Sequence, residues 1–113
     1  MRDIEITAEC LEFIDSQDQR VIDKFFQLID VISEVRIVNS NFIKKLQLSK
    51  FYELRIKVGN EYRVVILAID HLNFNECRKA VCPCGFQKKS TKDYKKAIKK
   101  AERILEIYLK QNK

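Results

Sequence analysis

The chain has 113 residues, of which 46% are hydrophobic and 34% charged, with two glycines and one proline. This length suffices for one buried core but not for two domains, and the composition excludes a disordered or fibrous chain. The longest apolar run, Val64–Ile69, is far shorter than the roughly 20 residues of a membrane helix, so no membrane partner is expected. Because Arg2, Asp3 and Glu5 argue against a secretory start, we expect a single soluble domain, residues 1–113, in the cytoplasm.

Charge is distributed unevenly along the chain, whose formal net charge is +6. Residues 1–34 carry a net charge of −6, residues 35–87 carry +5 and residues 88–113 carry +7. Such a basic second half indicates an acidic partner, either the phosphate backbone of nucleic acid or an acidic protein segment.

The four cysteines are expected to be reduced, since no secretory segment is predicted. Cys77, Cys82, Cys84 and the single histidine, His71, could in principle bind zinc. The spacing of these cysteines differs from the usual C-x2-C pair, so zinc is disfavoured and His71 is predicted to be a loop residue. The sequence also lacks a glycine-rich phosphate loop, a nucleophile elbow and a paired-carboxylate signature, so no cofactor is expected.

Two helices are predicted in the first third of the chain. Thr7 can cap a short helix that ends near Asp15, and Asp18 can cap a longer one that continues to about Val35. Both segments carry apolar residues at helical spacing, so together they predict a helical hairpin. Ile4 and Ile6 either form a short strand or pack beneath the first helix.

The middle of the chain predicts strands. Residues 38–49 contain a turn before the basic pair Lys44 and Lys45, and residues 52–57 then alternate apolar and charged side chains as a half-buried strand does. A turn at Gly59-Asn60 leads to a central strand over residues 62–69.

A polar stretch, residues 70–79, is either a loop or an extension of this hairpin. Residues 80–86 form a third predicted strand, in which Pro83 indicates a sheet edge or a bulge. Ser90 or Thr91 then caps a closing helix whose buried stripe runs from Tyr94 to Tyr108.

The predicted fold class is α+β, with the helical hairpin and the C-terminal helix packed on a small antiparallel sheet. The helices would cover the apolar sheet face and leave Glu53 and Arg55 exposed on the other. That exposed face is the candidate working surface.

Four short motifs follow one another with a consistent spacing: Lys44-Lys45-Leu46, Phe51–Arg55, Tyr62-Arg63-Val64, and Gly85–Ser90 with the lysine-rich helix behind it. Their order resembles the HigB-like branch of the RelE/ParE toxin superfamily. The resemblance covers most of the chain and implies a twisted antiparallel sheet with packed helices. It also implies the toxin of a type II toxin–antitoxin pair, a metal-independent endoribonuclease that cleaves mRNA on the ribosome.

By this resemblance, Arg55 and Arg63 grip the phosphate, Glu53 is the base, and Lys88 or Lys89 is the cation or acid. Tyr62 and Phe86 could stack on a splayed base. Further RNA contacts are expected from the basic pair and from a basic stripe on the last helix. These residues are Lys44, Lys45, Lys92, Lys96, Lys99 and Arg103.

Each of these expectations has a structural alternative. Glu53, Arg55 and Arg63 could form cross-strand ion pairs, Tyr62 could be a core residue, and the stripe could be an ordinary solvated helix face. The alternative functions are a non-catalytic gyrase inhibitor like the ParE toxins and a plain RNA-binding module. The expected partners are mRNA or the ribosome, and a cognate antitoxin, a small helix-turn-helix protein.

Overall fold

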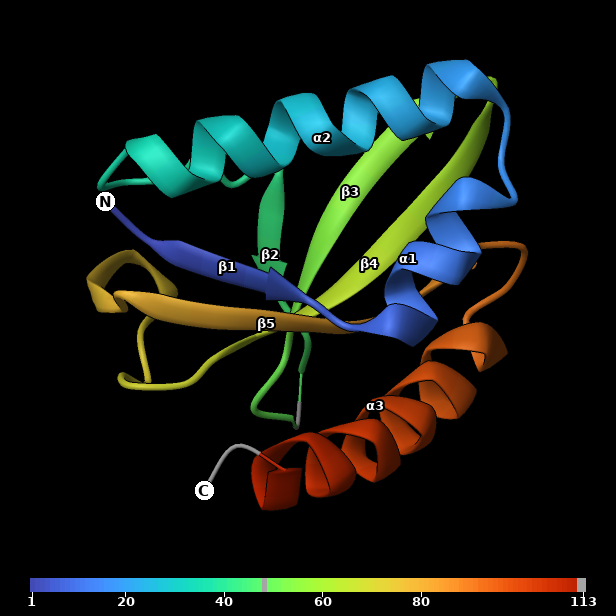
Figure 1. The fold of residues 1–113 in the computed structure, drawn as a ribbon. Helices are drawn as coiled ribbons and strands as arrows, with labels where there is room; N and C mark the ends of the chain where they lie inside the picture. The colour runs from blue at the N-terminus through green and yellow to red at the C-terminus, as the bar shows by residue number, and fades with distance from the viewer. Residues whose placement is uncertain (48, 112–113) are drawn as a thin grey trace.

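A computed structural model of the protein describes residues 1–47 and 49–111. These residues form an α+β fold with three helices and a five-stranded sheet (Figure 1). The elements are β1 (Asp3–Ile6), α1 (Ala8–Asp15), α2 (Gln19–Glu34), β2 (Ile43–Lys45), β3 (Tyr52–Val58), β4 (Asn60–Ala68), a short 3₁₀ turn (Phe74–Glu76), β5 (Lys79–Gln87) and α3 (Lys92–Gln111). None of the described helices combines the length and hydropathy of a bilayer-spanning segment.

The two predicted N-terminal helices are confirmed with their caps. The Thr7 hydroxyl accepts a hydrogen bond from the Cys10 amide, and the Asp18 carboxylate accepts one from the Arg20 amide. Each cap satisfies an amide that the first helical turn leaves without a partner. The alternative in which Ile4 and Ile6 form a strand is also confirmed, because both lie in β1.

The sheet has the strand order β1-β5-β4-β3-β2. β2, β3, β4 and β5 are antiparallel neighbours, whereas β1 pairs in parallel with β5. The sheet is therefore mixed: it is antiparallel from β2 to β5, as the sequence predicted, and parallel only where β1 adds to its edge. β2 was not predicted as a strand, because three residues are too few to show an alternating pattern and only their pairing with β3 defines them.

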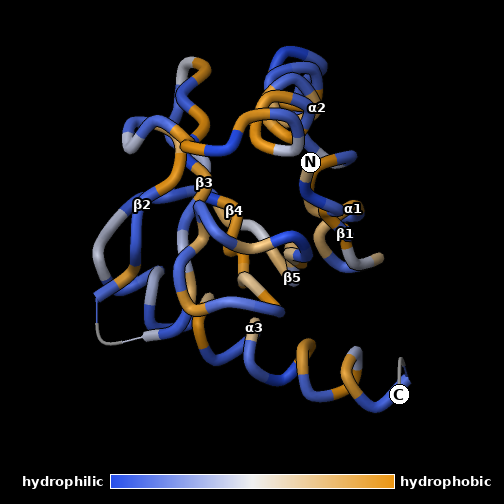
Figure 2. The backbone as a smooth tube through the Cα atoms, turned by 90° about the vertical axis from the view of Figure 1, so that its left-hand side faces the viewer, coloured by the Kyte–Doolittle hydropathy of each residue, from blue (hydrophilic) through white to orange (hydrophobic). Residues whose placement is uncertain are grey.

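Helices cover both faces of the sheet. In Figure 1, α2 lies on one side of the strands and α3 on the other, and Figure 2 shows the same two-sided arrangement from the side, with hydrophilic and hydrophobic residues alternating along both helices. Two separate apolar clusters result, one beneath α1 and α2 and one beneath α3. The expectation of an open second face is therefore wrong, because the apolar stripe of α3 needs a sheet surface of its own.

The central place of β5 resolves the alternatives at Pro83. β5 lies between β1 and β4, so Pro83 is not on an edge strand. Val65 pairs with Cys84 and Leu67 with Val81, so β5 has one residue more than β4 across this interval. The bulge alternative is thus the correct one. The bulge also changes the alternation of the strand: Cys82 packs in the cluster beneath α1 and α2, while Cys84 packs beneath α3.

Gly85 allows α1 to approach the sheet closely. A Cβ atom at this position would lie 2.6 Å from Cδ2 of the Phe13 ring, which is closer than carbon atoms pack. The glycine of the Gly85-Phe86 motif therefore has a packing role, independent of any chemistry.

Candidate functional site

A cluster of charged side chains lies on the α3 face of the sheet, towards the β3–β4 turn. Glu53 and Arg55 are two residues apart on β3 and point to the same face, and Arg55 is the cross-strand partner of Arg63 on β4. Phe86 on β5 continues the same row, because it pairs with Arg63. The strand register therefore brings together three of the predicted catalytic residues.

Arg63 is the most buried of these residues, with 1% of its surface exposed. Its Nη1 atom donates to the Tyr62 carbonyl (3.0 Å), Nη2 to Oε1 of Glu61 (3.0 Å) and Nε to the Tyr94 hydroxyl (3.1 Å). Burial by itself lowers the pKa of Arg63, but the hydrogen bonds to Glu61 and Tyr94 outweigh it and the pKa is raised. Arg63 thus stays a cation inside the protein.

Glu53 links the two arginines. Its Oε1 lies 3.6 Å from Nε of Arg55, and its Oε2 lies 3.7 Å from Nε of Arg63. Glu53 is 5% exposed and lies beside the Tyr94 hydroxyl of α3, so the expectation that it stands on an open surface is wrong. The Arg55 side chain is 36% exposed and reaches solvent, as does that of Glu61, which is 44% exposed. The alternative in which Glu53, Arg55 and Arg63 form ion pairs therefore agrees with the structure.

Tyr94 belongs to this cluster, although the sequence indicated only a core role for it. Its ring packs edge-on against Phe86, with centroids 5.3 Å apart, and Nζ of Lys88 lies 5.8 Å from the ring centroid. Burial raises the pKa of the Tyr94 hydroxyl, and the nearby Glu53 carboxylate raises it further. The helical pattern predicted that Tyr94 faces the sheet, but no local signal indicated that an arginine would meet it there.

Lys88 and Lys89 lie where β5 turns into α3. The Lys88 amide donates to the Glu61 carbonyl (2.8 Å), and Asp93 accepts hydrogen bonds from the amides of Lys89 and Ser90. These two bonds lower the pKa of Asp93. The turn is therefore held by its backbone, while the side chain of Lys89 is exposed and that of Lys88 is half-buried.

The other predicted RNA-binding residues are divided between surface and core. Lys44, opposite Glu53, and Lys45 are exposed on β2, and Nζ of Lys45 lies 5.1 Å from the Tyr52 ring centroid. Tyr62 is 6% exposed and packs in the cluster beneath α1 and α2, on the opposite side of the sheet from Arg63. This position agrees with the core alternative for Tyr62.

The basic stripe of α3 faces solvent along its whole length. Its members, Lys92, Lys96, Lys99 and Arg103, are all exposed. Lys96 and Lys100 also line a pocket of about 190 Å³ between α3 and the end of β5, with Phe86 and Gln87 on the strand side. Exposed basic side chains therefore follow one another from the β5–α3 turn along α3 to Arg103.

The cysteines are small apolar core residues in this fold. All four are free and buried. Burial raises the pKa of Cys10 to about 12 and that of Cys84 to about 11, and it raises the pKa of Cys82 as well. Metal binding requires thiolates, which such an environment disfavours. Among residues 1–47 and 49–111, no group of three or more potential ligands could hold a metal ion, and His71 is an exposed loop residue.

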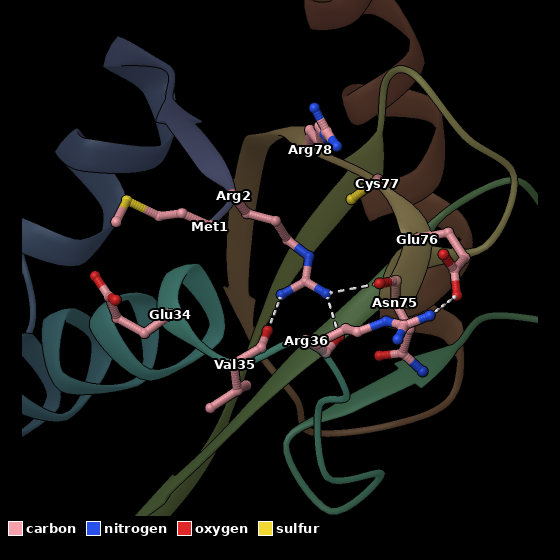
Figure 3. A pocket seen from close by; sticks show the side chains of 9 residues that line it. All are labelled: Met1, Arg2, Glu34, Val35, Arg36, Asn75, Glu76, Cys77 and Arg78. Atoms are coloured by element: carbon pink, nitrogen blue, oxygen red, sulfur yellow. Dashed lines mark hydrogen bonds and ion pairs between the residues drawn. The ribbon is translucent and has the colours of Figure 1, made fainter.

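A second pocket surrounds Arg2, near the N-terminus of the chain and the end of α2 (Figure 3). This pocket has a volume of about 540 Å³. The Arg2 guanidinium uses all five of its N–H groups on main-chain carbonyls, and Figure 3 shows it directed at the end of α2 and at the 3₁₀ turn. Since no donor of Arg2 is left over, the pocket is better explained as a structural junction than as an anion site.

Comparison with known proteins gives one match. The family model described as "Phage derived protein Gp49-like (DUF891)" matches residues 12–106. The matched residues begin in α1 and end in α3, so they include Glu53, Arg55, Arg63 and Tyr94. No curated protein and no solved structure matches the chain.

Proposed function

The chain belongs to the phage-derived Gp49-like family, a toxin-like family of toxin–antitoxin systems, and on that premise we propose that it is a toxin that cleaves mRNA. The proposed activity is that of a metal-independent endoribonuclease acting on ribosome-bound mRNA in the cytoplasm. The observation that carries this proposal is the Arg55 side chain, which reaches solvent and is paired with the buried Glu53 carboxylate.

Arg55 is the residue proposed to contact the scissile phosphate. When the 2′-hydroxyl of RNA loses its proton to a solvent water molecule and attacks the adjacent phosphorus, the bond to the 5′-oxygen breaks and negative charge accumulates on the phosphate oxygens. A guanidinium can bind two of these oxygens at once, and a donor oriented before the reaction stabilises the transition state most. Lys88 or Lys89 would add positive charge and supply the proton for the leaving 5′-oxygen.

The burial of Glu53 and Arg63 supports a different role for them than direct contact with substrate. We assign to them the orientation of Arg55, because Glu53 lies between the two guanidinium groups. Phe86, Lys44, Lys45 and the basic stripe of α3 would bind the RNA strand around the reacting phosphate.

A cognate antitoxin is the second proposed partner. An inhibitor that covers the positive surface of α3 with acidic groups would block RNA access and would be attracted over the same surface. A small helix-turn-helix protein encoded beside this chain is the expected antitoxin.

The replacement Arg55→Ala tests the proposed activity. Loss of an oriented cation is expected to lower the rate of mRNA cleavage by about a hundredfold and to abolish growth arrest, with the fold unchanged. Cleavage is measured on translating ribosomes with a chelator present, and Arg36→Ala, an exposed arginine at the Arg2 pocket, is the control. Full cleavage by the Arg55→Ala protein would remove this residue from the mechanism.

The same burial of Glu53 and Arg63 also favours a second candidate, a non-catalytic inhibitor or RNA-binding module of this fold. In that case the ion pairs only stabilise the sheet. Growth arrest without any cut mRNA, together with inhibition of supercoiling by purified gyrase, would support a gyrase inhibitor. RNA binding without cleavage or gyrase inhibition would support the binding module.

A further inference from the structure

Four side chains form a continuous series from α3 to the protein surface. Tyr94 contacts Arg63, Arg63 is paired with Glu53, and Glu53 is paired with Arg55. We propose that Tyr94 is the positioning residue of the site: its hydroxyl sets the orientation of Arg63 and, through Glu53, that of Arg55. This inference rests on the proposed function, since it assigns a cause to the orientation of the proposed phosphate-binding residue.

Of the three hydrogen-bond partners of the Arg63 guanidinium, Tyr94 is the one that lies outside the sheet, on α3. The other two hydrogen bonds of the Arg63 guanidinium go to Tyr62 and Glu61, its own neighbours in β4. Only the bond from Nε to the Tyr94 hydroxyl crosses from the sheet to α3. Because Arg63 is 1% exposed, water cannot easily replace that acceptor. The direction of Nε, the atom that also faces Glu53, therefore depends on Tyr94.

Tyr94 is itself held in place from two sides. Phe86 contacts its ring edge-on, and the Lys88 ammonium lies 5.8 Å from the ring centroid. Asp93, its neighbour in the first turn of α3, fixes the preceding loop through the amides of Lys89 and Ser90. The hydroxyl thus has a defined position, which a group that orients another must have.

The weakest contacts in the series are the two ion pairs of Glu53. Both distances, 3.6 Å and 3.7 Å, exceed those of a hydrogen bond, and Oε2 of Glu53 is buried without a hydrogen-bond partner among the described residues. The Glu53 carboxylate also lies close enough to the Tyr94 hydroxyl to raise its pKa, so its position depends on Tyr94 as well as on the two guanidinium groups. A shift of Arg63 would therefore be transmitted to Arg55.

The replacement Tyr94→Phe tests this inference, because it removes the hydroxyl and keeps the ring. Tyr108→Phe is the matched control: Tyr108 is on the same helix and donates a hydrogen bond to Glu5, remote in the sequence from the cluster. Tyr94→Phe is expected to lower kcat for mRNA cleavage by about tenfold or more, with KM changed by less than about twofold. Tyr108→Phe is expected to change neither constant.

A double-mutant cycle separates positioning from a purely structural effect. If Tyr94 acts through Arg55, Tyr94→Phe has no further effect on kcat in the Arg55→Ala background. The same variant is expected to speed hydrogen exchange of the Nε–H groups of both Arg63 and Arg55, measured by NMR on the whole protein without RNA. Wild-type kcat in Tyr94→Phe, or an undiminished loss in the double variant, would overturn the inference. A wild-type protein that cleaves no mRNA would overturn the proposed function. The hydrogen-exchange rate of the Arg55 Nε–H group would still decide whether Tyr94 orients Arg55.

Discussion

Among the residues that the structure describes, two arginines are buried, Arg2 and Arg63, and they compensate the lost hydration of their charge in different ways. Arg2 is 5% exposed and donates five hydrogen bonds, all to main-chain carbonyls of α2, of the chain just after it and of the 3₁₀ turn. Arg63 is 1% exposed and donates two of its three hydrogen bonds to side chains, and it is paired with two carboxylates. Arg2 joins backbone segments, whereas Arg63 joins side chains.

The difference indicates which buried charge has a function beyond stability. Three of the carbonyls that Arg2 contacts, those of Ile32, Val35 and Arg36, lie at or just after the end of α2, where carbonyls lack helical partners and attract a cation. The other two hydrogen bonds of Arg2 go to carbonyls of the 3₁₀ turn, so all five acceptors are main-chain atoms. The interactions of Arg63 continue through Glu53 to a side chain in contact with solvent. A buried charge that is coupled to an exposed one can influence a ligand.

The largest expected effect is the loss of stability on Arg2→Met. This change leaves five buried or half-buried carbonyls without their charged donor, and we expect the free energy of unfolding to fall by about 4 kcal/mol. Urea denaturation followed by circular dichroism measures it. Arg36→Ala, in the exposed pair with Glu76, is the control and is expected to leave the unfolding midpoint almost unchanged. A small effect of Arg2→Met would mean that water replaces the guanidinium in this pocket.

Arg63→Met is expected to cost about 3 kcal/mol, because Glu53 then lacks its buried counter-ion. Adding Glu53→Leu to Arg63→Met is expected to restore much of this stability, since no buried charge remains unpaired. No second substitution can rescue Arg2→Met in this way, because the partners of Arg2 belong to the main chain. The comparison fails if the double variant is no more stable than Arg63→Met in the same urea experiment.

The dependence of stability on alkaline pH tests the buried thiols separately from the buried arginines. Burial raises the pKa values of Cys10, Cys82 and Cys84, so the folded chain keeps protons that the unfolded chain loses above a pH of about 8.5. Stability is therefore complete below that pH and falls as the pH rises towards the folded-state values, by about 1 kcal/mol per thiol and pH unit. Urea unfolding at pH 8 and pH 10 measures the loss, and Cys10→Ala should show a smaller pH dependence. Equal unfolding midpoints at the two pH values would contradict this account.

The smallest expected effect on the fold comes from the surface of α3. Changing Lys92, Lys96 and Lys99 together to Glu is expected to leave stability nearly unchanged but to weaken RNA and ribosome association by about tenfold or more at low salt. It should also slow antitoxin capture, and both effects should shrink as salt screens the charges. Reversing Asp23 and Asp30, on the opposite layer, should do little. If binding survives the triple change, the stripe is only a solvated helix face.

The sequence predicted the elements well where a periodic pattern was long. Both N-terminal helices, their caps, the β3–β4 hairpin and α3 follow from side-chain spacing and from residues that terminate helices or form turns. It could not predict β2, the parallel position of β1 or the choice between edge and bulge at Pro83. Each of these depends on which strand becomes a neighbour, and pairing between distant segments leaves no local pattern.

For the candidate site, the sequence by itself determined that Glu53 and Arg55 share a face of one strand, because side chains alternate along a strand. It also determined that the positive charge lies in the second half of the chain. Only the tertiary structure decided that Glu53 and Arg63 are buried while the side chain of Arg55 reaches solvent, and that Tyr94 lies at the end of the series. Periodicity shows that a helix has a buried face, but which strands it packs against is decided by how the two layers fit together.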